Sequence, residues 1–157
     1  MSIELAPEEA FTGFVREVEL RLRRALVAAL GFEAGREATA DALTYGWEHW
    51  ERVSQMENPA GYLYRVGRSK GRRYLARHVS FPALTSTEDD PLVEPGLSKA
   101  LSRLSERQRV CVMLVHGYGW KYDEVGDLLG IGPGTVHRHA ERALTTVRSV
   151  LEVRVDA

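Results

Sequence analysis

The sequence contains a single cysteine, no long apolar run and no alternation of polar and apolar residues that would predict a β-strand. Cys111 cannot form an internal disulfide, and we expect it to pack in the core. No segment approaches the ~18 uninterrupted apolar residues of a membrane span, and the acidic N-terminus differs from a secretory signal. These absences predict a cytoplasmic, all-α protein without membrane insertion.

Helical periodicity predicts the elements of the first half of the chain. One helix begins at Pro7, with acids in its first turn, and ends before Gly31. A second helix spans about residues 36–52, and a third begins at Pro59 behind an Asn58 cap. We expect these helices to form a first lobe at residues 7–79, a small helical domain.

The second half of the chain follows a flexible linker at residues 80–96, which is rich in proline and hydroxyl groups and carries the acidic stretch EDDPLVE at 88–94. A second lobe at residues 97–157 is predicted to be another small helical domain. Its expected helices span residues 97–104, 105–116 (opened by the capping-box pattern Ser105-x-x-Gln108), 122–129 and 133–154. We expect the two lobes to fold separately.

A concentration of positive charge lies in the third helix. Residues 64–77, YRVGRSKGRRYLAR, hold six positive charges, and no acid occurs from Asn58 to Thr87. A phosphate-binding loop needs four residues between its glycines, whereas Gly67 and Gly71 are separated by three. A basic localisation tag would be flanked by disorder, whereas this run lies inside a helical pattern. We expect the two glycines to allow another backbone to approach closely.

At ~100° per residue, the polar members of this helix fall within about 140° of one another. They form a cationic face: Arg65, Arg68, Ser69, Arg72 and Arg73. A solvated helix face normally mixes charges of both signs, so the absence of acids favours nucleic-acid binding over simple solvation. Tyr62 and Tyr64 offer rings on which an unpaired base could stack.

The second lobe contains the layout of a helix-turn-helix: a short helix, a turn at residues 130–132, and a longer helix from Pro133. Apolar residues have the spacing that fills the wedge between these helices: Val125, Leu129, Ile131, Val136, Ala140 and Leu144. In such a unit the start of the second helix enters the major groove of DNA. The candidate contacts are Thr135, His137, Arg138, His139 and Arg142.

Two histidines in this helix suggest further chemistry. His137 and His139 point to different sides of the helix, so a shared metal ion is not expected, and we predict no metal and no cofactor. Protonated imidazole could strengthen DNA binding below about pH 6.5.

Taken together, both lobes resemble a bacterial RNA polymerase sigma factor of the extracytoplasmic-function group of the sigma-70 family. EATADALTYGWEHW followed by ENPAGYLYRVGRSKGRR is similar to the second conserved region of that family. LSRLSERQRVCVMLVHGYGWKYDEVGDLLGIGPGTVHRHAERAL is similar to the fourth region. The resemblance covers residues 8–155.

The resemblance implies a non-catalytic subunit that positions RNA polymerase. It implies that the 36–50 helix docks on the clamp helices of the polymerase β′ subunit through Asp41, Thr44, Tyr45 and Glu48. The third helix, with the loop at residues 52–58, would hold the melting minus-ten promoter element. The second lobe would read the minus-thirty-five element and grip the β flap, and an anti-sigma protein would be a further partner.

Some positions depart from the family pattern. The family often has Gln at Ala40, Asn at Ser69, an apolar residue at Lys70, and Lys or Arg at His137 and His139. The departures at Ala40 and in the third helix motivate an alternative, a free-standing helix-turn-helix regulator that has kept the sigma fold but lost the polymerase. A nucleotide-binding enzyme is a third hypothesis, already weakened by the glycine spacing.

Overall fold

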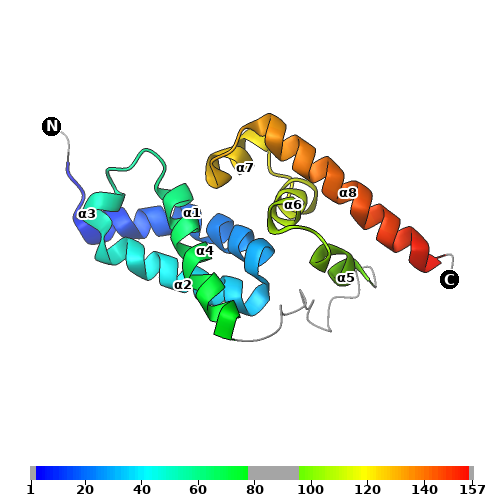
Figure 1. The fold of residues 1–157 in the computed structure, drawn as a ribbon. Coiled ribbons are helices and arrows are strands. Elements are labelled where there is room, and N and C mark those ends of the chain that lie inside the picture. Colours follow the sequence, from blue (N-terminus) through cyan, green and yellow to red (C-terminus); the bar gives the residue numbers. More distant parts are fainter. Residues whose placement is uncertain (1–2, 78–95, 156–157) are drawn as a thin grey trace.

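The computed structural model describes residues 3–77 and 96–155 (Figure 1). Every regular element within these ranges is helical, and neither range contains a strand. The predicted all-α class, with two groups of helices, is confirmed. The acidic stretch 88–94 and all of the predicted linker except Gly96 lie outside the described residues.

The first lobe contains α1 (Pro7–Leu30), α2 (Phe32–Glu48), α3 (Trp50–Val53) and α4 (Pro59–Arg77). The second helix begins earlier than residue 36, because Gly31 adopts φ +91° and lets a new helix start directly after α1. The predicted cap of α4 is present: Asn58 Oδ1 accepts a hydrogen bond from the Gly61 N–H at 3.0 Å.

Helix α4 lies close against α1 and α2, and its two central glycines make this possible. A Cβ atom at Gly67 would lie 2.7 Å from Leu26 Cδ1, and one at Gly71 would lie 2.3 Å from Leu30 Cδ1. Both leucines are buried, so neither can move aside easily. The sequence predicted that another backbone approaches these glycines, but the nearest atoms are leucine side chains; a backbone atom, the Ala38 carbonyl oxygen, lies 3.3 Å from a Cβ at Gly67. This packing fixes α4 with its cationic face turned away from the core of the first lobe.

The second lobe contains α5 (Leu97–Ser102), α6 (Glu106–Val112), the π-helical turn η1 (Met113–Gly117), α7 (Tyr122–Leu129) and α8 (Pro133–Val155). Ser105 caps α6, since its Oγ accepts a hydrogen bond from the Gln108 N–H at 3.2 Å. The helix expected at residues 105–116 is therefore present, but its last part widens into the π turn.

Helices α7 and α8 form the predicted helix-turn-helix. Gly130 ends α7 with φ +71°, and a Cβ atom at Gly126 would lie 2.5 Å from the Ile131 carbonyl oxygen. The wedge side chains lie as expected. Val125, Val136 and Ala140 are fully buried, and Leu129, Ile131 and Leu144 are partly buried.

The two lobes do not stand apart. Helix α1 packs against α6 and η1, and α4 packs against α7 (Figure 1). One cluster of buried side chains runs from Leu26 of the first lobe to Val110, Leu114 and Trp120 of the second. This packing between the lobes was not predicted, because sequence periodicity shows which face of a helix is buried but not what covers it; separate folding of the lobes stays a prediction.

Cys111 lies in this shared core and is completely buried. Burial raises the pKa of its thiol to about 11, which keeps the sulfur protonated and unreactive at neutral pH. The predicted packing role is confirmed.

Candidate nucleic-acid interface

The cationic face of α4 is divided between two environments. Arg65, Ser69, Arg72 and Arg73 are exposed, whereas Arg68 is partly buried. Arg68 Nε lies 2.5 Å from Glu106 Oε1, and Arg72 Nη2 donates a hydrogen bond of 3.0 Å to Glu106 Oε2. The face therefore does have an acid. Glu106 comes from the second lobe, which is why the sequence of α4 alone did not reveal it.

The rest of the face is open. Neither Arg65 nor Arg73 forms an ion pair with any residue of 3–77 or 96–152. Both lie with Ser69 on the cationic side of α4, at a spacing of one and two turns, and all three side chains are exposed. These side chains can therefore contact phosphates of a nucleic acid without any rearrangement of the protein.

The two candidate stacking rings have different environments. Tyr64 is only 2% exposed, and burial raises the pKa of its hydroxyl above the ordinary value. The expectation that an unpaired base could stack on Tyr64 was wrong, because the ring belongs to the core. Tyr62 is partly exposed, and stacking of an unpaired base on its ring stays a prediction.

Tyr62 belongs to a polar cluster at the start of α4. Its hydroxyl lies 3.1 Å from that of Tyr45, and Arg52 Nη2 donates to Tyr45 at 2.6 Å and to Tyr62 at 3.2 Å. The shared hydrogen bond lowers the pKa of Tyr45 and raises that of Tyr62, as expected when the Tyr62 hydroxyl donates. The cluster links α2 to α4 and fixes the Tyr62 ring beside the loop at residues 52–58.

The predicted polymerase-binding residues lie on α2. Asp41, Thr44 and Glu48 are exposed along one side of the helix, one turn apart. Tyr45 lies on the same side, but its hydroxyl is engaged by the cluster just described. Next to Glu48, Trp47 is 43% exposed, and its ring centre lies 5.3 Å from the ring centre of Phe11. An acidic side with an adjacent aromatic ring suits a basic protein partner.

Helix α8, the predicted DNA-reading helix, presents most of its candidate side chains on one face. Thr135, Arg138, His139 and Arg142 fall on the same side, opposite the buried stripe of Val136, Ala140 and Ala143. Arg138 Nη2 donates to Thr135 Oγ1 at 3.3 Å, which holds the guanidinium near the start of the helix.

His137 does not share this face. Its ring packs edge-on against Tyr122 of α7, with 5.1 Å between the ring centres. His137 is exposed and lies about 100° around α8 from Arg138, outside the face that carries Thr135, His139 and Arg142. Contact of His137 with DNA stays a prediction.

The environment of His139 changes the expected pH dependence. Partial burial, together with Arg107, Arg142 and Arg138, lowers its pKa below the ordinary 6.5. A lowered pKa means that His139 gains its charge only at a pH below that value, so it stays neutral over more of the range considered in the sequence analysis.

Sequence reasoning missed Glu106 and Arg109, and it placed Arg52 in the loop at residues 52–58 without its contacts to Tyr45 and Tyr62. Arg109 is 4% exposed, and its Nε and Nη2 donate to the carbonyl oxygens of Ala28 and Ala29 at 2.7 and 2.6 Å. Burial lowers the pKa of its guanidinium. A charged residue beside the apolar run 110–115 was the available signal, but its partner is the backbone of α1, which sequence spacing cannot identify.

Nowhere in the described residues do three or more histidine, cysteine, aspartate or glutamate side chains gather as metal ligands. No helix among them is both long enough and apolar enough to cross a bilayer.

Comparison with known families gives the second lobe its identity. Residues 96–147 match the family described as Sigma-70, region 4. These residues are a sigma-70 region 4 domain. The match includes α5, α6, α7 and most of α8, and therefore contains the whole helix-turn-helix.

Two curated relatives of this chain are sigma factors. The chain is 35% identical over 71 residues to RNA polymerase sigma factor CarQ of Myxococcus xanthus, covering 45% of this chain and 41% of CarQ. It is 26% identical over 128 residues to Probable RNA polymerase sigma factor RfaY of Xanthomonas campestris pv. campestris, covering 68% of this chain and 32% of RfaY. The chain spans less than half the length of these two curated relatives.

A solved structure shares the fold across both lobes. The sigma factor RpoE in complex with the anti-sigma factor NepR from Bartonella quintana has a TM-score of 0.67 at 19% identity. The likeness covers 92% of this chain and 98% of that one. The resemblance to extracytoplasmic-function sigma factors, expected from the sequence, is confirmed.

Proposed function

We propose that this protein is a sigma factor that binds core RNA polymerase and directs promoter-specific initiation of transcription. In this proposal α4 holds the minus-ten element as it melts, and α8 of the region 4 domain reads the minus-thirty-five element. The observation that carries the proposal is the match of residues 96–147 to sigma-70 region 4. The exposed cationic side of α4 suits the proposed contact with the minus-ten element.

The protein would act without covalent chemistry, in the cytoplasm, as a subunit that positions the polymerase. Asp41, Thr44 and Glu48 of α2 would contact the β′ clamp helices, with Tyr45 contributing its ring. The region 4 domain would contact the β flap. An anti-sigma protein is a further proposed partner, supported by the relative that was solved in complex with one.

The cluster at Tyr62 suits a role in promoter melting. A base that leaves the duplex exposes a ring face, and stacking on an aromatic side chain is worth ~1–3 kcal/mol. Tyr62 is held by Tyr45 and Arg52, so its ring would not have to be ordered when DNA arrives. The neighbouring loop at residues 52–58 would then shape the pocket for that base.

A free-standing helix-turn-helix regulator remains the second candidate. It is favoured by Ala40, which is exposed on the α2 surface where the family often has Gln. Lys70 also departs from the family, and its Nζ lies 5.9 Å from the Tyr45 ring centre, within the cluster that joins α2 to α4.

The two candidates separate when purified protein is added to core polymerase. We expect co-migration with the core enzyme and promoter-directed transcripts. Asp41→Arg with Glu48→Arg should abolish co-migration while the helical content is kept, because both side chains are exposed. Glu17→Arg, an exposed acid of α1, is the matched control and should bind normally. If the unaltered protein never co-migrates with core polymerase, the regulator is the correct function.

A further inference from the structure

A single carboxylate of the second lobe holds two arginines of the cationic face. Each Glu106 oxygen faces a different guanidinium, Arg68 at 2.5 Å and Arg72 at 3.0 Å. Only 26% of the Glu106 side chain is exposed, and Arg68 Nε is covered from solvent. An anionic group with oxygens directed at two guanidiniums is also how a phosphate binds arginines.

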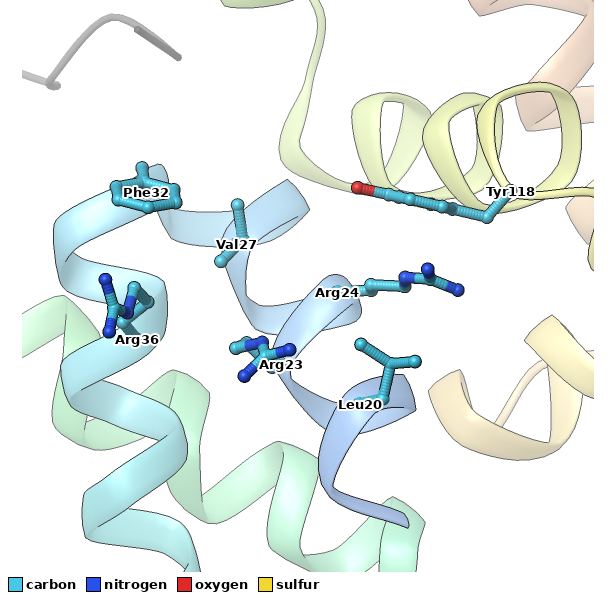
Figure 2. A pocket seen from close by; sticks show the side chains of 7 residues that line it. All are labelled: Leu20, Arg23, Arg24, Val27, Phe32, Arg36 and Tyr118. Carbon is cyan, nitrogen blue, oxygen red and sulfur yellow. The ribbon is translucent and has the colours of Figure 1, made fainter. Parts of the chain in front are cut away.

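Neighbouring contacts fix the position of Glu106. Arg109, one turn further along α6, is anchored on the Ala28 and Ala29 carbonyls of α1. The Tyr118 ring, which follows η1, lies over the Arg24 guanidinium at 4.3 Å, and Figure 2 shows this ring reaching from the second lobe to α1. Glu106 is thus presented to α4 by a packed interface rather than by one mobile side chain.

This packed arrangement cannot be the one that contacts both promoter elements. By their names, the two elements lie about 25 base pairs apart, which is about 85 Å of duplex at 3.4 Å per base pair. The longest helix among the described residues, α1, has 24 residues and is therefore only about 36 Å long. Lobes that share one core cannot span that distance along a straight duplex, so they must separate, and Glu106 must then leave α4.

We propose that the interface between the lobes is a self-masking surface in which Glu106 occupies the phosphate sites of Arg68 and Arg72 in the free chain. Nucleic acid and Glu106 compete for these two guanidiniums. Arg65 and Arg73 stay accessible, so the free chain retains a weak, incomplete contact with nucleic acid. This inference rests on the proposed function of α4 and adds that Glu106 regulates the binding of nucleic acid to the cationic face.

An acid at this position can also stabilise α6, and the experiment must separate this effect from competition with nucleic acid. Glu106 is the first residue of α6, where the helix dipole favours a negative charge. That contribution requires neither Arg68 nor Arg72. A variant that loses the charge would therefore change stability in either case, but only competition predicts tighter binding of nucleic acid.

The test measures binding of a short fluorescein-labelled oligothymidine strand to the full-length chain at low salt by fluorescence anisotropy. Three proteins are compared: the unaltered chain, Glu106→Gln and Glu124→Gln. Glu124 is the matched control because it also forms an ion pair between the lobes, with Arg21 of α1, but away from the cationic face. Thermal unfolding of each protein shows that the variants are folded.

Glu106→Gln is expected to bind the strand about three- to tenfold more tightly, the ratio that one or two partly exposed ion pairs can supply. Its affinity should also fall more steeply with salt, by about 0.7 in the logarithmic slope for each phosphate contact regained. Glu124→Gln should change the affinity less than about twofold, since an exposed pair contributes little.

Equal affinity for the unaltered chain and Glu106→Gln would overturn the inference, as would an equal gain in Glu124→Gln. Absence of binding by all three proteins would overturn it too, because the face would then hold no nucleic acid. Core-polymerase co-migration, measured on the same preparations, does not depend on Glu106. A sigma factor that lacks self-masking is thereby distinguished from a protein that is not a sigma factor.

Discussion

Arg109 is the side chain through which the second lobe completes a helix of the first. The last carbonyls of an α-helix lack partners inside the helix, and α1 has no basic residue in its own last turn. Arg109 supplies two donors and a positive charge at the negative end of the helix dipole. The cost of burying the Arg109 charge is therefore offset by its hydrogen bonds to the Ala28 and Ala29 carbonyl oxygens. Without Arg109, these oxygens would be buried without hydrogen bonds.

We expect Arg109→Met to lower the free energy of unfolding by roughly 2–4 kcal/mol, because two buried carbonyl oxygens lose charge-assisted hydrogen bonds. Urea unfolding followed by circular dichroism measures the change. Arg107→Ala, an exposed arginine of the same helix, is the control and should stay within about 0.5 kcal/mol of the unaltered protein. Equal stability of the two variants would show that the Arg109 contacts contribute nothing.

At the scale of the element, α4 depends on glycine where other helices carry side chains. Alanine normally stabilises a helix interior relative to glycine, but the neighbours of Gly71 leave no room for a methyl group. Leu30, which a new Cβ would meet, is 1% exposed. The same substitution thus has opposite consequences in different helices of this chain.

Gly71→Ala is expected to destabilise the protein by roughly 1–3 kcal/mol through overpacking, partly offset by helix propensity. Gly13→Ala in α1 is the matched control, because nothing lies within 4 Å of its new Cβ atom, and it should stabilise by up to about 1 kcal/mol. Melting temperatures of the two variants should therefore move in opposite directions. A rise in both would mean that α4 does not pack as closely as described.

For α8, we expect Arg138→Ala to weaken binding of upstream promoter DNA by about 1–3 kcal/mol and to relax the preference at one base pair. Arg148→Ala is the control, since Arg148 is exposed about three turns further along the same helix and on another side. Competition binding with single-base variants of the site measures both effects. An unchanged base preference in Arg138→Ala would remove Arg138 from the base-reading side chains.

The elements themselves were largely predictable from the sequence. Pro7, Asn58, Ser105 and Pro133 mark helix starts through local chemistry, and Gly126 with Gly130 marks the helix-turn-helix. Local rules also predicted the cationic face, because the helical period alone shows that its five side chains lie on one side of the helix. The early start of α2 was not predicted, because Gly31 is both the C-cap of α1 and the N-cap of α2.

What the sequence could not show is the relation between distant segments. Tyr64 and Tyr62 have the same chemistry and differ only in which side of α4 meets the core. Glu106 lies 34 positions after Arg72, and no local rule connects them. Pairing across the lobes is a property of tertiary packing, so it became visible only when α1, α4 and α6 were placed together.

At the scale of the whole molecule, the central claim is that α4 holds promoter DNA while it opens. The variant Arg68→Glu with Arg72→Glu reverses the charge of two side chains of that face and also repels Glu106, so it cannot act by tightening the contact between the lobes. Arg21→Glu with Arg24→Glu is the matched control, because these arginines contact the second lobe from α1 without belonging to the face.

The most direct measurement is the fluorescence of 2-aminopurine placed in the minus-ten element of a promoter that the reconstituted holoenzyme selects from fragmented genomic DNA. Holoenzymes with the unaltered protein and with the Arg21, Arg24 control should raise the fluorescence as the duplex opens. The Arg68, Arg72 variant should bind core polymerase normally and leave the fluorescence low. A normal rise with that variant would contradict the account, because it would show that Arg68 and Arg72 have no part in promoter opening.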